Sequence, residues 1–577
     1  MEFGTGCVKV TPCHDPNDFE MGQRHNLEQI LVFNEDATVN ANGGKYEGMD
    51  RYECRKAVVK DLEEGGWLVK IEDHEHNVGT CYRCGTTVEP MTSAQWFVKM
   101  APLAKPAMDV VNEGKTKFVP DRFSKTYLRW MENVHDWCIS RQLWWGHRIP
   151  AFYCDDCGEM TVSKTDVCTC PKCGSKNIRQ EEDVLDTWFS SALWPFSTLG
   201  WPDKTKELDY FYPTSTLVTG YDIIFFWVAR MIFSGVEHMG ETPFKTVYIH
   251  GLVRDAQGRK MSKSLGNVID PNKVCDEMGA DIIRLWVASV DTSSDVSIDH
   301  EILARTSDAY RRFRNTLRFL LSELEGQFEP ETDGVAFADL LPLDKLMVAR
   351  LTQVQAEVDD AYASYEFPRA YRALYDFVVT ELSNVYLDAL KDRLYCEKPG
   401  SLERRSAQTV LAELFSMLMR DLQPILSYTV DEAMAYAPAG CVDHQKYAAL
   451  LDWYKSPITV DEANEFEGVL EASLELRSAV TKALEDARSA GTFTKSQQVR
   501  VKAVVPAEMY ALLTGDKAVD LAEFYIVSDV ELTQGEELSV AIEAAEGECC
   551  DRCWNYRTTV GEYNGHAHIC KRCADAL

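Results

Sequence analysis

The sequence predicts an α/β protein followed by an all-α bundle and a small cysteine-rich module. Three observations predict this order. Residues 244–249 form an apolar strand that leads into a glycine-rich loop and then a helix at 274–287, as in a βαβ unit. After residue 300 the pattern changes to long helical periodicity, which is typical of a bundle. The last part of the chain carries two CxxC pairs.

Length and composition exclude several classes of protein. The chain has 577 residues, 45% of them hydrophobic and 26% charged, with a formal net charge of −31. This length allows about three to five compact domains, and the composition excludes disorder, collagen and a small disulfide scaffold. The negative charge argues against a uniformly basic surface for nucleic acid, so any such site must be a local patch.

No membrane span or secretory signal is visible. The apolar stretch 223–233 is interrupted by Arg230 and is shorter than the roughly 18–20 residues that cross a bilayer. Met1 is followed by neither a basic start nor an apolar core. We therefore expect no membrane partner and a cytoplasmic location.

The elements follow in order along the chain. Residues 1–90 alternate β-like runs, such as Cys7–Val10, with Gly- and Asn-rich turns, which predicts part of a small mixed α/β unit. Because this unit begins abruptly, we expect the chain to be a fragment. Helices are predicted at 302–324, 345–365, 368–393, 406–422 and 467–492, and strands at 498–505 and 523–532.

The most specific motif is Lys260–Asn267, with the sequence Lys-Met-Ser-Lys-Ser-Leu-Gly-Asn. Two lysines three residues apart, on a loop whose Ser and Gly residues allow close backbone approach, can hold a polyphosphate and the charge that develops as pyrophosphate leaves. A lone KxxK is more often a solvated basic loop, but an eight-residue string is much less accidental.

This string resembles the KMSKS signature of class I aminoacyl-tRNA synthetases, and its flanks resemble the branched-chain members. The resemblance implies that the complete enzyme activates an amino acid with ATP and Mg²⁺ and transfers it to tRNA. It implies that Lys260 and Lys263 are catalytic and stabilise the transition-state phosphates. The implied ATP contacts are His250, Gly251, Lys260, Met261, Ser262, Lys263 and Ser264.

Residues 1–267 resemble valyl-tRNA synthetase. The resemblance implies that Trp145 and Trp227 wall the amino-acid pocket and that Asp222 is a polar contact near the substrate. Both tryptophans could instead be core aromatics. Four strings carry the likeness: Gly4–Phe19, Ile139–Gly146, Asp183–Ser191 and Gly220–Trp227.

The first segment resembles the distal part of the editing domain of this family. Lys9, Asp15 and Asp18 match positions that line its hydrolytic pocket. A structural explanation competes, because Asp15 before Pro16 is a good helix N-cap and Asp18 suits the helix dipole. One carboxylate can serve both purposes.

CxxC pairs in a reduced cytosol indicate zinc more than disulfides. Two such pairs, separated by twelve residues, can close a tetrahedral structural site with no open position. Cys168 is near enough to replace one of them, and Cys81 with Cys84 forms only half a site. The predicted zinc ligands of this site are Cys154, Cys157, Cys170 and Cys173.

Residues 268–577 resemble isoleucyl-tRNA synthetase instead, for example at Asp295–Ile298, Asp308–Phe319 and Lys391–Cys396. The end of the chain fits the isoleucyl C-terminal zinc module. The change from valyl-like to isoleucyl-like sequence falls near Lys260–Asn267, a string that both families share. The predicted ligands of the terminal zinc are Cys550, Cys553, Cys570 and Cys573.

The predicted bundle also has a candidate RNA surface. Arg311, Arg314 and Arg318 recur at helical spacing opposite an apolar face, so they share one exposed side of a helix. Such a stripe can bind tRNA phosphates. The alternative is a solvated, salt-bridged face.

Taken together, the sequence predicts a branched-chain class I tRNA ligase, specific for valine or, as the alternative, isoleucine, and monomeric. It contains no HIGH-type motif, so an alternative of another class is an inactive tRNA-binding remnant or a gene-fusion artefact. The expected parts are the distal part of a β-rich editing domain (1–90), the second half of an incomplete Rossmann-type class I catalytic domain with a zinc insertion at 154–173 (91–300), an anticodon-binding bundle (301–460), an α+β linker region (461–545) and a zinc module (546–577).

Overall fold

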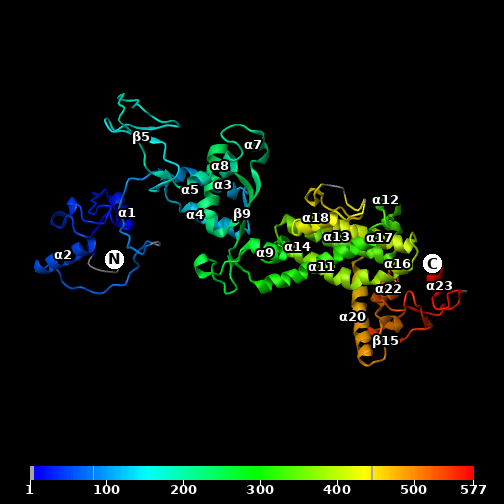
Figure 1. The fold of residues 1–577 in the computed structure, drawn as a ribbon. Helices are drawn as coiled ribbons and strands as arrows, with labels where there is room; N and C mark the ends of the chain where they lie inside the picture. The colour runs from blue at the N-terminus through cyan, green and yellow to red at the C-terminus, as the bar shows by residue number, and fades with distance from the viewer. Residues whose placement is uncertain (1–5, 82–83, 439, 443–445, 564) are drawn as a thin grey trace. The chain divides into compact units, whose positions relative to one another are not determined.

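The computed structural model describes residues 6–81, 84–438, 440–442, 446–563 and 565–577, which fall into two compact units (Figure 1). The first unit contains residues up to Lys115, Thr126–Thr214 and Phe225–Phe244. The second contains Thr116–Lys125, Ser215–Ile224 and Lys245–Leu577. Among the described residues, no helix combines the length and apolar character that a bilayer span requires.

The first unit begins with two helices and irregular chain. Helix α1 (Pro16–His25) and helix α2 (Arg51–Glu64) are joined by turns and isolated bridges such as Phe33 with Val39. The predicted β-like run at Cys7–Val10 is wrong, because the structure places no strand there. A β pattern becomes a strand only when a second strand supplies the ladder.

The rest of the first unit combines helices with short antiparallel strand pairs. Helix α3 (Ala101–Asn112) packs against helix α8 (Ala229–Met239). The short helices between them in sequence are α4 (Arg122–Glu132), α5 (Thr187–Ser191), α6 (Trp194–Ser197) and α7 (Lys206–Phe211). The strand pairs are β1 (Phe97–Val98) with β3 (Trp137–Cys138), and β4 (Ser140–Arg141) with β8 (Val184–Leu185). A separate antiparallel sheet has the order β6 (Met160–Val162), β5 (Ala151–Cys154) and β7 (Ile178–Gln180).

The second unit begins with a three-stranded sheet whose central strand is β10 (Phe244–His250). Strand β2 (Lys117–Val119) pairs with it in parallel, and β9 (Thr214–Gly220) lies on its other side. The predicted strand is thus confirmed. The single helix predicted at 274–287 is two helices, α9 (Pro271–Met278) and α10 (Ala280–Ser289), because Gly279 separates them with a φ of 93°.

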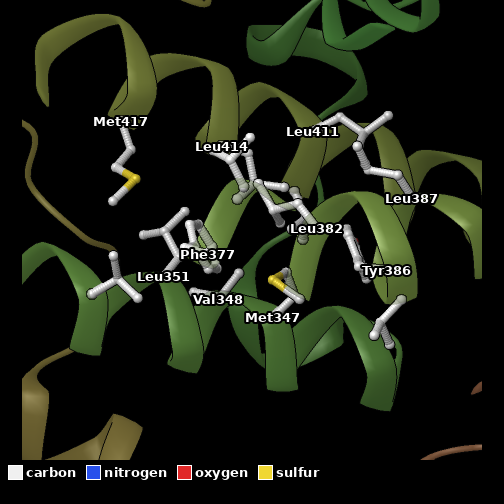
Figure 2. Packing of buried hydrophobic residues seen from close by; sticks show 14 of the residues in the cluster. Met347, Val348, Leu351, Phe377, Leu382, Tyr386, Leu387, Leu411, Leu414 and Met417 are labelled. Atoms are coloured by element: carbon white, nitrogen blue, oxygen red, sulfur yellow. The ribbon is translucent and has the colours of Figure 1, made fainter. Parts of the chain in front are cut away.

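The all-α prediction for the next part is confirmed. Three of the helices predicted between 302 and 422 are single helices, α11 (His300–Leu324), α13 (Pro342–Ala363) and α17 (Leu402–Leu422), and they lie side by side (Figure 1). The helix predicted at 368–393 is instead divided into α14 (Phe367–Asp376), a π-helical segment (Phe377–Tyr386), α15 (Leu387–Ala389) and the start of α16 (Lys391–Cys396). Apolar residues of α13, of the helical segment 377–387 and of α17 interdigitate in one core (Figure 2). The bundle helices are α11 (His300–Leu324), α13 (Pro342–Ala363), α14 (Phe367–Asp376), α16 (Lys391–Cys396), α17 (Leu402–Leu422) and α18 (Ser427–Met434).

A helix and a small sheet follow the bundle. Helix α20 (Glu467–Ser489) confirms its prediction, and β13 (Val499–Val505) is the central strand of the order β14-β13-β15. Strand β14 (Asp529–Gln534) runs parallel to it and β15 (Ser539–Ala544) antiparallel. The strand predicted at 523–532 is partly wrong, because its first residues end a helix, α22 (Leu521–Tyr525), capped by Asp520.

Candidate functional site

Asp255 anchors the loop that contains the two predicted catalytic lysines. It follows strand β11 (Val253–Arg254) and is 6% exposed. Its carboxylate accepts hydrogen bonds from the backbone N–H of Arg259 at 2.8 Å and from Nδ2 of Asn267 at 2.9 Å. The hydrogen bond from Asn267 is the largest cause that lowers the pKa of Asp255, to about 2. One carboxylate therefore holds both ends of the loop.

Asn267 continues this network into the loop itself. Its Oδ1 accepts from the backbone N–H of Ser262 at 2.9 Å, and its Nδ2 also lies 3.3 Å from the carbonyl oxygen of Lys260. With the backbone held in this way, the side chains of Lys260 and Lys263 are exposed to solvent. Met261 is half-buried. The side chain of Ser264 lies outside the described part of the chain.

His250 and Gly251 lie at the carboxyl end of β10. His250 Nδ1 donates to the carbonyl oxygen of Gly251 at 2.7 Å. A Cβ at Gly251 would lie 2.1 Å from the carbonyl carbon of Ser294, so only glycine fits this close approach of two backbones. Asp295 holds the same two backbone segments together, because its carboxylate accepts a hydrogen bond from the backbone N–H of Leu252 at 2.8 Å.

Asp222 lies beside His250 in the second unit. The position of a Cβ on Gly220 is 2.8 Å from Asp222 Oδ1 and 3.7 Å from His250 Cε1, so both side chains border this glycine. The carboxylate of Asp222 is exposed. A predicted pocket residue and a predicted ATP contact are thus neighbours.

The two predicted pocket tryptophans belong to the first unit. Trp145 is 90% exposed, so it is not a core aromatic. Trp227 is half-buried, and its Nε1 donates to the carbonyl oxygen of Ser191 at 3.1 Å. Asp222 belongs to the other unit.

The three predicted editing residues lie at the start of α1. Asp15 is the N-cap and accepts from the N–H groups of Asn17 at 2.8 Å and Asp18 at 3.0 Å, which confirms the structural reading. Asp18 Oδ2 accepts from the N–H of Thr11 at 2.7 Å, and Lys9 Nζ donates to Thr11 Oγ1 at 3.2 Å. Asp15 also lines a cleft of about 920 Å³ within the first unit.

The first predicted zinc site is assembled by two equivalent turns. Gly158 N–H donates to Cys154 O at 2.8 Å, and Gly174 N–H donates to Cys170 O at 3.0 Å. Two pairs of Sγ atoms from the four predicted cysteines lie 3.6 Å apart, and all four atoms lie within 4.8 Å of one another. A tetrahedron with Zn–S bonds of about 2.3 Å has edges of about 3.8 Å, so the donor set fits zinc.

The other cysteines near this site are not part of it. Cys168 is exposed and does not join the cluster. Cys81 lies in the same kind of turn, since Gly85 N–H donates to its carbonyl oxygen at 2.8 Å. Within the described ranges, Cys81 and Cys84 meet no further metal-ligating side chains.

The terminal cysteines form the second cluster. Cys553 Sγ lies 3.9 Å from Cys570 Sγ, while Cys550 and Cys573 are fully buried. All four Sγ atoms lie within 4.8 Å of one another, which again fits a closed tetrahedral zinc site. This module is held against α16 by Arg572, whose guanidinium pairs with Asp392.

The predicted arginine stripe is exposed along α11, and Phe313 on the opposite face is buried. Arg311 pairs with Asp308 at 2.7 Å. Arg314 and Arg318 instead line a groove of about 360 Å³ between α11 and α18, with an apolar floor. The structure therefore brings two of the three arginines to one groove.

Sequence reasoning missed the residues that support the site. These residues include Asp255 and Asn267, which fix the lysine loop. Asn267 is the last residue of the motif, so its position there was a signal in the sequence. Asp186, which is 4% exposed, pairs with Arg141 at 2.6 Å. Both residues lie inside strings that carried the family resemblance, but the pattern of residue types did not reveal their pairing.

Three parts of the chain match known families. Residues 19–299 match tRNA synthetases class I (I, L, M and V), residues 344–503 match the anticodon-binding domain of tRNA ligase, and residues 547–576 match the zinc finger found in FPG and IleRS. The first match includes the lysine loop and the first cysteine cluster. The last includes the second cluster.

The chain is also similar to curated valine–tRNA ligases. It is 52% identical over 433 residues to that of Clostridium acetobutylicum, covering 75% of this chain and 49% of the relative. It is 52% identical over 442 residues to that of Thermotoga maritima, covering 76% and 50%. The chain thus spans about half the length of the curated relatives that it matches.

These aligned stretches are longer than residues 1–267. The likeness to valine–tRNA ligases therefore continues beyond Asn267, even though the terminal zinc finger is of the type found in FPG and IleRS. The synthetase domain, the anticodon-binding domain and the zinc finger occur in the predicted order. The chain belongs to the class I tRNA synthetases of the I, L, M and V group.

Proposed function

We propose that this chain provides the lysine loop, amino-acid pocket and tRNA-binding bundle of a valine–tRNA ligase, which attaches valine to its tRNA at the expense of ATP. The observation that supports this proposal most is the loop at 260–267. Asp255 and Asn267 fix its backbone, and both lysine side chains face solvent. The 52% identity to valine–tRNA ligases supports the choice of valine. Isoleucine is the alternative, since one methylene in an apolar pocket discriminates by only about 1–3 kcal/mol.

The loop suits the first chemical step. When the amino-acid carboxylate attacks the α-phosphate of ATP, negative charge develops on the departing pyrophosphate. Lys260 and Lys263 would stabilise this charge, and Mg²⁺ would also bind the phosphates. Because the backbone is already fixed, little reorganisation is needed when the phosphates arrive. His250 and Gly251, on the same unit, would border the nucleotide together with the rest of the loop.

For the amino acid, we propose Trp145 and Trp227 of the first unit as aromatic walls and Asp222 of the second unit as a polar contact. The exposure of Trp145 supports this role, because a solvated indole is free to cover a ligand. Asp222, next to His250, would face the substrate amine. An exposed carboxylate is a suitable partner for an ammonium group.

Editing is proposed for the segment around α1. Lys9, Thr11 and Asp18 form a hydrogen-bonded chain, and Asp15 borders the adjoining cleft. A mischarged aminoacyl end would place its ammonium near these carboxylates. An editing site suits a valine enzyme, since an apolar pocket rejects a hydroxyl-bearing isostere poorly.

The bundle is proposed as the tRNA partner surface. Arg314 and Arg318 would contact phosphates, and the groove beside them would accept an unstacked base. Each cysteine cluster would bind a zinc ion with a structural role. By family resemblance, we place the protein in the cytoplasm as a monomer.

The test is amino-acid-dependent exchange of pyrophosphate into ATP, together with tRNA binding, by the purified chain. Exchange with valine above the level with isoleucine supports the proposal, and exchange with isoleucine alone overturns the choice of amino acid. A second candidate, a tRNA-binding chain without adenylate formation, is favoured by the lack of a HIGH-type motif in these 577 residues. That candidate predicts retained tRNA binding with no exchange.

A further inference from the structure

Helix α10 contacts the turn that joins α17 to α18 in the second unit. Arg284 of α10 donates from Nε to the carbonyl oxygen of Ile425 at 2.9 Å and from Nη2 to that of Pro424 at 2.7 Å. Both carbonyl groups lie between the two bundle helices. The guanidinium therefore fixes this turn against α10.

Asp281, one helical turn before Arg284, caps the start of α18. Its Oδ2 accepts from the backbone N–H of Thr429 at 2.8 Å and from Thr429 Oγ1 at 2.6 Å, and its Oδ1 lies 3.4 Å from the N–H of Tyr428. The residue at the usual capping position, Leu426, makes no side-chain capping bond. Because the first N–H groups of a helix have no partner within it, a buried carboxylate from α10 replaces the local cap.

Thr429 belongs both to this contact and to the groove that contains Arg314 and Arg318. It lines the groove, and its Oγ1 also lies 3.0 Å from the hydroxyl oxygen of Tyr310 on α11. The Thr429 hydroxyl donates its one proton to Asp281, so it accepts the hydrogen bond from Tyr310. One hydroxyl group thus connects the groove with α10 and α11.

Another side of α10 packs against the lysine loop. Ile282 and Trp286 of α10 are buried in one apolar cluster with Val274 of α9. Met261, which directly follows Lys260, is half-buried against the same cluster. Closely packed side chains transmit small displacements, because there is little free volume to absorb them. A change in the position or order of α10 therefore reaches the lysine loop.

A strand pair and α11 connect the same two regions. Strand β11, which leads into Asp255, pairs in parallel with β12 (Val296–Ser297), which leads into α11. Arg314 lies about 21 Å along α11 from His300, at 1.5 Å per residue. The groove and the base of the loop are thus attached to one continuous helix, which Tyr310 and α10 brace from the side.

We propose that Asp281 is a positioning residue that couples occupancy of the groove to the order of the lysine loop. RNA phosphates on Arg314 and Arg318 restrain α18, Thr429 passes this restraint to Asp281 and α10, and the loop packed on α10 becomes more ordered. A ligand that orders one part of a packed network lowers the cost of ordering the rest. The inference rests on the proposed functions of the groove and of the loop.

Hydrogen–deuterium exchange of the full chain, followed by peptide mass spectrometry, measures this coupling. We expect saturating bacterial tRNA to slow exchange at residues 256–268 by about threefold. Asp281→Ala should abolish the slowing while the affinity for tRNA changes by less than about twofold. Asp281→Asn keeps an acceptor oxygen at the start of α18 and should retain the slowing. Bound tRNA without any slowing in the unaltered chain, or slowing that persists in Asp281→Ala, would refute the proposal.

Asp520→Ala is the matched control for Asp281→Ala. Asp520 also caps a helix, α22, by accepting from the N–H groups of Ala522 at 2.9 Å and Glu523 at 3.3 Å. This variant loses an equivalent cap away from α10, so the slowing by tRNA should remain. Loss of the slowing in both variants would make the effect a general loss of stability and overturn the specific role of Asp281.

A second measurement needs no RNA. Thr429→Val removes the Oγ1 bonds to Asp281 and Tyr310, so exchange at residues 256–268 should become about twofold faster in the free chain. Thr514→Val, which removes a bond to the carbonyl oxygen of Tyr510, should leave the loop unchanged. Faster exchange confined to α18 would overturn the coupling. If tRNA does not bind, the proposed role of the bundle is wrong, and this comparison still decides the coupling, as it does if Asp281→Ala does not fold.

Discussion

Arg572 and Asp392 form a two-pronged ion pair between the terminal zinc module and helix α16. Arg572 Nη1 lies 2.6 Å from Asp392 Oδ2, and Nη2 lies 2.7 Å from Oδ1. Arg572 directly precedes Cys573, one of the predicted zinc ligands. The contact therefore links the metal cluster to the bundle through one side chain.

Replacing Arg572 with methionine should loosen this module without disturbing the bundle core. Because both side chains are partly exposed, 36% and 28%, solvent screening limits the expected loss to about 1 kcal/mol. Limited proteolysis should cut the last 30 or so residues several-fold faster in the variant. Lys571→Met, which removes an adjacent exposed cation, is the control. Equal cleavage in both variants would show that the pair does not hold the module.

The cysteine clusters predict two zinc ions per chain. Each Cys154→Ser and Cys550→Ser variant should lose one ion, because each removes one of four thiolate ligands from a closed site. Elemental analysis of the purified protein measures the ratio. Cys168→Ser is the matched control and should keep both ions, since this exposed thiol lies outside the cluster. Loss of zinc from the control would place Cys168 among the ligands.

Asn267→Ala should weaken ATP binding while the fold persists, if the proposed function holds. The change removes the bonds to Asp255, Ser262 and Lys260 that order the loop. We expect about a tenfold weaker affinity, which corresponds to roughly 1.4 kcal/mol. Calorimetric titration with ATP measures it. Asn272→Ala, an exposed asparagine in α9, should have no effect. An unchanged affinity for Asn267→Ala would mean that the loop needs no such support.

The helices could be predicted from the sequence because their periodicity is local. The residues that form the buried stripe of α11, such as Phe313 and Leu317, are three or four positions apart. The break at Gly279 was missed, since a glycine within a periodic pattern does not by itself reveal a φ of 93°. Strand prediction failed at Cys7–Val10 because pairing depends on segments elsewhere in the chain.

The candidate site shows the same difference between local sequence patterns and contacts that the tertiary fold makes. The lysines and cysteines were predicted because motifs fix their spacing in sequence. Asp255 and Asn267 are 12 residues apart, and Arg572 and Asp392 are 180 residues apart. Such pairings are set by the tertiary fold, so residue types alone do not show them. The contact between Asp281 and Thr429, which are 148 residues apart, is likewise visible only in the folded chain.

Glu523 should make the second unit less stable as the pH rises through the weakly acidic range. Its Oε1 lies 2.5 Å from Arg393 Nε, but Arg393 also pairs with the fully buried Asp344 at 2.7 Å. Burial therefore dominates over the attraction of Arg393 and raises the pKa of Glu523 from 4.5 to about 7.

The sign follows from proton binding. Between about pH 4.5 and 7 the folded state holds a proton that the unfolded state has released, so the free energy of unfolding falls as the pH increases, by at most about 3 kcal/mol. Urea unfolding followed by circular dichroism at pH 5 and pH 7.5 measures this fall. Glu523→Gln should flatten it, because the amide cannot ionise, whereas Glu508→Gln, at an exposed position, should not. A slope that persists in Glu523→Gln would assign the titration to another buried acid.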